Sequence, residues 1–266
     1  MVSFIHISDL HILEDPEATQ YGVNCYYRLE GVIAEINALQ PRPSFAIITG
    51  DLVSDGREGS YHRLKSLLHS LKVPVHFALG NHDSRRAFRQ AFLNEASEEP
   101  LYTSFDHGDL HFVILDSLKE GKPTGEIDRD QLSWLRSDLD KNRAKPTLLF
   151  IHHQILPIRI RWLDELKLEN PDDLLGALEE AGNVRWVFYG HVHQSRLWRY
   201  KGIFFASVPS TGFQVPDHSQ TMMVTDDPPG FRLVEVWGKG LRTALKLLGS
   251  GLQPGPSFEA LPIYIR

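Results

Sequence analysis

Short apolar runs alternate with amphipathic stretches along most of the chain. Many of the runs are rich in β-branched and aromatic residues, and most of them close with Gly, Asp or Asn. Runs of this kind are typical of strands that are buried in a sheet. The pattern predicts strands at residues 4–8, 45–49, 75–79, 111–116, 147–153, 184–190, 202–208, 221–226 and 231–237.

Apolar residues recur at helical spacing in several of the segments between these strands, which predicts helices at residues 27–39, 61–71, 128–139 and 171–181. Asp128 opens one of them and Gln131 follows three residues later, as in a capping box. In the last helix, Asn170 is the expected N-cap, Pro171 the first helical residue, and Gly182 the residue just past the end.

The order of these elements indicates the fold class. Strands alternate with helices in the first part of the chain and follow one another directly in the last part, which favours an α/β protein with mixed sheets. The sequence contains no internal repeat, low-complexity run or interdomain linker. We therefore expect one domain over residues 1–250, followed by a C-terminal tail over residues 251–266 that begins near a Pro/Gly-rich stretch.

Composition narrows the possible partners and location. The chain has 266 residues, 42% of them hydrophobic and 23% charged, as is ordinary for a globular protein. The formal net charge of −6 offers no basic surplus for a nucleic-acid polymer. The single cysteine, Cys25, excludes an internal disulfide, and we find neither a signal peptide nor an apolar run long enough for a membrane span. A cytoplasmic protein without a membrane partner is the expectation.

Residues able to bind metal follow five of the predicted strands, each time at the carboxyl end, which is the end where α/β sheets bind ligands. Two pairs among them are spaced i, i+2, so their side chains point to the same face of an extended segment. The residues are Asp9 and His11, Asp51, Asn81 to Asp83, His152 with His153, and the pair His191 and His193.

The chemistry of these side chains predicts a metal centre. Oxygen and imidazole donors without a thiolate suit Zn, Mn, Fe or Co with open coordination positions. Seven ligands are too many for one ion but fit two if a carboxylate bridges them, and such a pair can clamp an in-line phosphoryl displacement. The seven candidate ligands are Asp9, His11, Asp51, Asn81, His152, His191 and His193.

The series D-x-H, G-D, G-N-H-D, H and G-H-x-H over residues 9 to 193 resembles the calcineurin-like metallophosphoesterase superfamily. The stretches INALQPRPSFAIITGDLVSDG, LDS, TLLFIHHQ, GHVHQS and PST, with the later Gln214, resemble bacterial class III cyclic nucleotide phosphodiesterases and their glycerophosphodiesterase relatives. The resemblance implies a four-layer α/β-β/α sandwich of two mixed sheets with a dimetal site at its top. It also implies a ligand assignment: Asp9, His11 and His193 for one ion, Asn81, His152 and His191 for the other, and Asp51 as the bridge.

The neighbours of these ligands have expected roles of their own. His82 is the candidate proton donor to the leaving alkoxide, with an orienting role as the alternative. Asp83 should hydrogen-bond a ligand or cap a helix that begins near Ser84. Alternation along the strand should turn His153 away from the site. Relatives tend to carry His at the position of Phe213.

The sequence therefore predicts a dimetal phosphodiesterase that acts on a small-molecule diester. The expected substrate is a 3′,5′-cyclic nucleotide such as cAMP, attacked by a hydroxide that bridges the metals. A glycerophosphodiesterase, a broad-specificity phosphodiesterase and a phosphomonoesterase are the enzymatic alternatives. A non-catalytic binding scaffold is a further alternative, although such a protein should lack a ligand position. A homodimer or higher oligomer stays open, as does the role of residues 155–168 as a lid, an interface or a packed loop.

Overall fold

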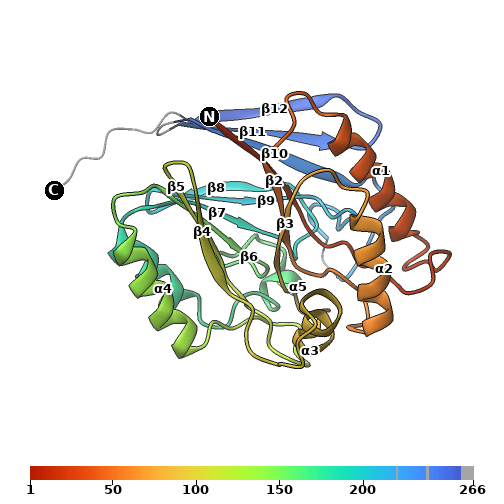
Figure 1. Ribbon diagram of the computed structural model, residues 1–266, viewed down its shortest axis with the longest axis horizontal. Helices are drawn as coiled ribbons and strands as arrows, with labels where there is room; N and C mark the ends of the chain where they lie inside the picture. The colour runs from red at the N-terminus through yellow and green to blue at the C-terminus, as the bar shows by residue number, and fades with distance from the viewer. Residues whose placement is uncertain (220, 238–239, 259–266) are drawn as a thin grey trace.

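Two six-stranded sheets pack face to face in the computed structural model, which describes residues 1–219, 221–237 and 240–258 (Figure 1). The first sheet has the order β12-β11-β10-β1-β2-β3. Strands β1, β2 and β3 run parallel, whereas β10, β11 and β12 are joined by antiparallel pairing. Their bounds are Val2–Ile7 (β1), Phe45–Thr49 (β2), Val75–Ala78 (β3), Gly230–Trp237 (β10), Gly240–Leu247 (β11) and Leu252–Phe258 (β12).

The second sheet has the order β4-β5-β6-β7-β9-β8. Its four central strands are parallel, and an antiparallel strand lies at each edge. The bounds are Thr103–His107 (β4), Leu110–Ile114 (β5), Thr147–Ile151 (β6), Val184–Tyr189 (β7), Leu197–Tyr200 (β8) and Ile203–Ser207 (β9). Both sheets are therefore mixed, as predicted.

Helices cover the outer face of each sheet (Figure 1). A core of apolar side chains joins α1 (Cys25–Ala38), α2 (Glu58–Leu68), α3 (Arg85–Phe88) and the π-helical turn η1 (Arg89–Leu93) to the first sheet. A second core joins α4 (Arg129–Lys141), α5 (Arg161–Asp164) and α6 (Pro171–Ala181) to the second sheet. The four-layer arrangement expected from the resemblance is confirmed.

A third core of aromatic rings fills the space between the two sheets. Phe4 of β1 stacks on Phe45 and meets the rings of Phe112, Phe150 and Phe188 edge-on at 5.6–5.9 Å between centroids. Each buried phenylalanine contributes roughly 1.5–3 kcal/mol relative to an exposed one. This packing holds the two sheets in a defined relation, so residues that follow strands of different sheets meet at one end of the sandwich.

The structure differs from the predicted strands near the C-terminus. Residues 221–226 are not a strand: Met222 and Met223 are exposed, and only Thr225 forms an isolated bridge, to Gln214. The strands β4, β8, β11 and β12 were not predicted, because each lies at or beside a sheet edge and lacks a continuous apolar run. The domain boundary at residue 250 stays a prediction, but the pairing of β12 with β11 favours an end no earlier than Phe258.

Two of the predicted helix caps have different outcomes. Asp128 accepts a hydrogen bond from the backbone of Gln131 at 2.7 Å, as expected for an N-cap. Asn170 is the N-cap residue of α6, as predicted, but it makes no capping hydrogen bond, because its side chain pairs with the backbone of Ile127 instead. Pro171 does begin that helix, and Gly182 ends it at a φ of 70°.

The segment 155–168 is packed into the core of the second sheet. Five of its apolar side chains are buried there, which supports its interpretation as a packed loop: Ile155, Ile158, Ile160, Leu163 and Leu168. The lid and the interface stay predictions.

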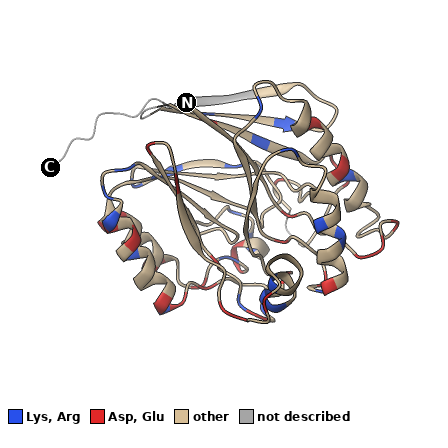
Figure 2. Ribbon diagram, viewed as in Figure 1, with Lys and Arg blue, Asp and Glu red and all other residues tan. Residues whose placement is uncertain are grey.

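Charged residues of both signs are interspersed along α2 and α4 (Figure 2), whereas the charged residues of α6 are all acidic. Within the described ranges, no helix has both the length and the apolarity needed to cross a bilayer.

Candidate metal centre

Five loops that leave the carboxyl ends of β1, β2, β3, β6 and β7 carry the candidate ligands. Three of these strands belong to the first sheet and two to the second. Backbone hydrogen bonds tie the loops together: Asp9 donates to the carbonyl of Gly50, and Gly190 donates to that of His152, at 3.0 and 3.1 Å. All seven side chains predicted from the sequence therefore lie at the same end of the sandwich.

A first donor set gathers Asp9, His11 and His193 around one oxygen of Asp51. His193 Nε2 lies 3.3 Å from Asp9 Oδ1 and 3.2 Å from His11 Nε2, and His11 Nε2 lies 3.8 Å from Asp51 Oδ2. All four side chains are buried. Two carboxylates and two imidazoles thus converge on one small volume.

A second donor set joins Asn81, His152 and His191, with His152 beside the other oxygen of Asp51. His152 Nε2 lies 3.1 Å from Asn81 Oδ1, 3.2 Å from His191 Nδ1 and 3.4 Å from Asp51 Oδ1. The two oxygens of Asp51 therefore face different donor sets. This geometry suits a bridging carboxylate, and the assignment of the seven residues as ligands remains our proposal.

The backbone of these loops is strained. Strained residues are common at functional sites, where the surrounding structure holds them in place. A positive φ is uncommon for residues other than glycine and costs on the order of 1–3 kcal/mol. Five candidate ligands adopt it: Asp9 at 56°, His11 at 50°, Asp51 at 48°, His191 at 66° and His193 at 53°.

Gly50 shows why the strand ends need glycine. Its φ is 90°, and a Cβ placed there would lie 2.6 Å from His152 Nδ1 and 2.7 Å from the backbone nitrogen of Gly80. Any side chain would push apart the two loops that carry Asp51 and Asn81.

Neighbouring groups fix the orientation of the imidazoles. His152 Nδ1 lies 2.7 Å from the carbonyl oxygen of Thr49, and His193 Nδ1 lies 2.7 Å from that of Phe213. Both rings therefore donate through Nδ1 and offer the Nε2 lone pair to the donor set. The Phe213 ring also stacks on His11 at 4.7 Å between centroids.

The electrostatics favour ionised carboxylates within this buried site. Burial opposes ionisation of Asp51, but the charges of His152, His82 and His11 and a hydrogen bond with His152 together outweigh it and hold the pKa of Asp51 well below its usual range. Burial likewise opposes the charged form of His152, yet Asp51 raises the pKa of that imidazole to about 9. For His11 and His191, burial dominates and lowers the pKa to about 3. Two anionic carboxylates and the imidazoles, that of His152 after it has lost its proton, are the donors that a pair of cations requires.

The donor set therefore fits two divalent or trivalent transition-metal ions. Its atoms are oxygens and imidazole nitrogens, with no thiolate among them, as in open catalytic sites. The pairs of nitrogens 3.2 Å apart, from His11 and His193 and from His152 and His191, would repel unless a proton or a cation lies between their lone pairs.

His82 lies beside the first donor set. Its exposed ring meets the His11 ring edge-on at 5.0 Å, and its backbone nitrogen donates to Asp51 Oδ1 at 2.9 Å. His82 Nδ1 lies 3.1 Å from the carbonyl oxygen of Ser54, so Nδ1 donates and Nε2 is left to face a ligand.

Asp83 hydrogen-bonds to the backbone of the loops that carry the ligands and not to the candidate ligand side chains. It accepts hydrogen bonds from the backbone nitrogens of Leu52 and Gly80, and from the hydroxyl of Tyr61, at 2.8–3.2 Å. Ser84, and not Asp83, caps α3. Of the two roles expected for Asp83, helix capping is thus wrong, and its hydrogen bonds go to the loop backbone.

His153 lies beside the second donor set, so the expectation that strand alternation turns it away from the site is wrong. Strand β6 ends at Ile151, so the alternation of a strand no longer applies two residues later. One nitrogen of His153 lies within 4.8 Å of nitrogens of both His152 and His191. Its Nδ1 pairs with Ser117 Oγ at 2.8 Å, whereas Nε2 is buried and has no partner among the described residues.

The arginines that follow GNHD are engaged elsewhere. Arg85 pairs with the buried carboxylate of Asp116 at 2.8 Å, and Arg89 pairs with Glu95. Both guanidinium groups are thus held in ion pairs with carboxylates that are not candidate metal ligands.

Comparison with known proteins is consistent with this geometry. Residues 2–195 match the calcineurin-like phosphoesterase family. A 3′,5′-cyclic adenosine monophosphate phosphodiesterase, CpdA, of Haemophilus influenzae is 30% identical over 247 residues, which cover 92% of this chain and 90% of that protein. A 3′,5′-cyclic-nucleotide phosphodiesterase of Nostoc is 29% identical, with 91% and 90% covered.

A solved dimetal phosphatase from Danio rerio has a similar fold. The TM-score is 0.72 at 16% identity, and the similarity covers 91% of this chain and 95% of that one. At this identity the likeness concerns the fold alone.

Proposed function

This chain belongs to the calcineurin-like phosphoesterase family and is a metal-dependent phosphodiesterase; we propose that it hydrolyses 3′,5′-cyclic nucleotides such as cAMP. The observation that carries the proposal is the convergence of seven donors from five strand ends, with the two oxygens of Asp51 turned to different donor sets. The relatives named as cyclic nucleotide phosphodiesterases match over most of their length, which supports the choice of substrate.

The residues divide the reaction between them. When bound, two metal ions would lower the pKa of a water molecule and neutralise charge on the phosphoryl oxygens. Asp51 holds the two donor sets together, and Thr49 and Phe213 keep His152 and His193 in the tautomer that binds metal. His82 lies outside the donor sets. In its imidazolium form it carries a proton on each ring nitrogen, so Nδ1 donates to the carbonyl of Ser54 while Nε2 gives its proton to the alkoxide that leaves.

The role of His82 is tested by His82→Ala. We expect both ions to remain bound while kcat for the diester falls by about 10²–10⁴, the usual contribution of general acid catalysis. Metal analysis and steady-state rates measure the two effects. His62→Ala, which removes an exposed histidine of α2, is the control. An emptied metal site in His82→Ala would instead make His82 a ligand.

The substrate is tested by a panel of rates on the protein loaded with Mn²⁺, Fe²⁺, Co²⁺ or Zn²⁺. The values of kcat/KM for 3′,5′-cyclic AMP, 2′,3′-cyclic AMP, glycerophosphoethanolamine and a monoester are compared. We expect 3′,5′-cyclic AMP to rank first. A wide margin for the monoester would refute the diesterase preference.

One observation favours a second candidate, a glycerophosphodiesterase or a broad-specificity phosphodiesterase. Phe213 places an apolar ring against His11 and His193, where relatives tend to carry a histidine able to hydrogen-bond a substrate. The scaffold alternative is disfavoured because no ligand position is missing. Loss of both turnover and metal binding in the same panel would support it.

The remaining expectations are part of the proposal. A cytoplasmic location agrees with the free thiol of Cys25, and the acidic net charge of −6 argues against a nucleic-acid polymer as substrate. A homodimer or higher oligomer remains open to sedimentation analysis.

A further inference from the structure

Tyr21 occupies the tip of a tight turn beside the metal centre. Gln20 and Val23 exchange two backbone hydrogen bonds, at 2.8 and 2.9 Å, so only Tyr21 and Gly22 separate them. Both of these residues have positive φ, 52° and 79°. Two positive φ values define the family of tight hairpin turns in which Asn, Asp and Gly are strongly preferred at the first position.

A tyrosine at this position is sterically disfavoured. Asn or Gly would adopt the same φ without strain, whereas a bulky side chain with positive φ is a genuine outlier. Such outliers collect at binding sites, where the surroundings hold them in place. The geometry of the turn therefore does not account for the presence of an aromatic residue at position 21.

The contacts of Tyr21 direct its ring toward the donor sets. The ring meets that of Phe213 edge-on at 4.9 Å, and Phe213 in turn stacks on His11 at 4.7 Å. Yet 55% of Tyr21 stays exposed, so most of the ring is free to contact a ligand.

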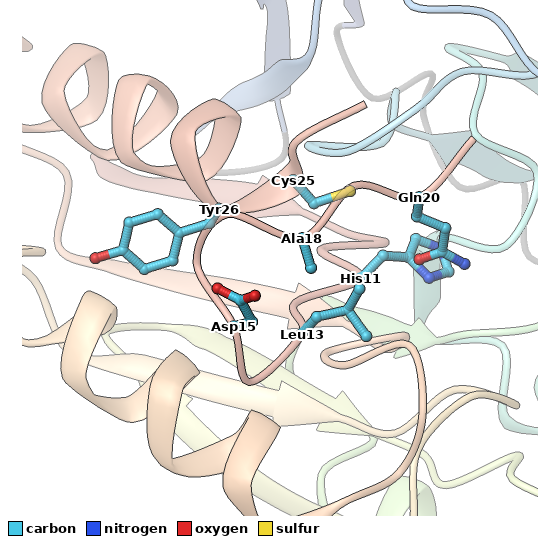
Figure 3. A pocket seen from close by; sticks show the side chains of 7 residues that line it. All are labelled: His11, Leu13, Asp15, Ala18, Gln20, Cys25 and Tyr26. Carbon is cyan, nitrogen blue, oxygen red and sulfur yellow. The ribbon is translucent and has the colours of Figure 1, made fainter. Parts of the chain in front are cut away.

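The loop that carries Tyr21 is fixed to the same rim as His82. Gln20 hydrogen-bonds to the hydroxyl of Ser54, whose backbone carbonyl accepts from His82 Nδ1. Figure 3 shows that Gln20 also lines a narrow hollow together with His11. Tyr21 and His82 are thus two exposed rings, each in contact with one end of the His11–Phe213 stack.

We propose that Tyr21 is the base-stacking residue of the substrate site and binds the nucleobase of a cyclic nucleotide. This inference rests on the proposed function. The base of such a substrate is joined to its phosphate by a single ribose, so a phosphate at the donor sets leaves the base beside the rim. Stacking on one aromatic ring accepts any base, because every base has a π-face. The subsite therefore favours nucleoside diesters over diesters that lack an aromatic ring.

The sharpest variant is Tyr21→Asn, because asparagine tolerates the positive φ of the turn and removes only the ring. Tyr21→Phe keeps the ring. Tyr200→Asn is the matched control: Tyr200 is 40% exposed and pairs with Ile203 at the start of β9, which is the end of the sheet away from the donor sets.

We expect Tyr21→Asn to raise KM for 3′,5′-cyclic AMP about ten- to one-hundred-fold, with the thermal midpoint unchanged or higher. The variants Tyr21→Phe and Tyr200→Asn should keep the KM of the wild type. Calorimetry of the Mn²⁺-loaded protein supplies a second readout: affinity for 5′-AMP should fall in Tyr21→Asn, whereas affinity for ribose 5-phosphate should not.

The two proposals fail in different ways. Turnover of cyclic AMP by the wild type with an unchanged KM in Tyr21→Asn would overturn the stacking role and leave the proposed function intact. An equal loss of affinity for 5′-AMP and ribose 5-phosphate would also overturn it, because the effect would then concern the phosphate. A wild type that does not hydrolyse cyclic AMP would refute the proposed function itself.

Discussion

The two donor sets of the metal centre differ in charge and in enclosure. The first contains the carboxylate of Asp9 in addition to one oxygen of Asp51, and Phe213 packs against its imidazoles. The second contains the other oxygen of Asp51 and the neutral amide of Asn81, which is only partly buried. Its His191 Nε2 is buried and has no hydrogen-bond partner among the described residues.

Because of this difference, the two donor sets should bind cations with different affinities. A cation in the first set would meet more negative charge in a more enclosed space, so it should bind more tightly and exchange more slowly. A cation in the second set should exchange more readily. Asp51 belongs to both sets and couples them.

The largest expected effect comes from removing that coupling. Asp51→Asn replaces the shared carboxylate by a neutral amide, so both ions should bind more weakly and kcat/KM should fall by about 10³-fold or more, since metal charge stabilises the transition state by several kcal/mol. Elemental analysis and rates measure the two losses. Asp55→Asn, which changes a carboxylate that lies beside Arg57 outside the donor sets, is the control. Retention of one tightly bound ion by Asp51→Asn would show that the sets are independent.

A smaller effect should be confined to the second donor set. The buried ring of His153 lies 4.8 Å from that of His191 between centroids, and Ser117 orients it. Loss of a group that supports a ligand commonly costs 10- to 100-fold in metal affinity. His153→Ala should therefore weaken the more exchangeable ion by about that factor and leave the tighter ion in place. Equal weakening of both ions, measured by metal titration, would contradict the assignment of His153 to one set.

The smallest effect is that of a change of one pH unit. The pKa of His152 rises to about 9 beside Asp51, above its ordinary value of 6.5. Its proton therefore stabilises the metal-free fold fully below pH 6.5, and this stabilisation is lost as pH rises through 9. Metal must displace that proton, so affinity of the second set should rise about tenfold per pH unit between these values. Calorimetry in buffers of different ionisation enthalpy measures the released proton, and affinity independent of pH would contradict the pairing.

The candidate ligands could be predicted from the sequence because each follows a strand of strong apolar pattern. Buried parallel strands such as β2 and β7 can be recognised in a sequence by their continuous apolar residues. Their carboxyl ends lie at one edge of a sheet. The strands β11 and β12 and residues 221–226 were misjudged for the opposite reason. Their conformation depends on which neighbour they pair with, and local pattern carries little of that information.

By itself the sequence therefore determined the identity of seven candidate ligands, the neighbouring His82 and the α/β class of the fold. Tertiary structure alone decided that the two oxygens of Asp51 face different donor sets, that His153 turns toward His191, and that Tyr21 rests on Phe213. The physical reason is distance along the chain. Strand pattern and loop residues are local properties, whereas these contacts join segments that meet only after the aromatic core has packed the two sheets together.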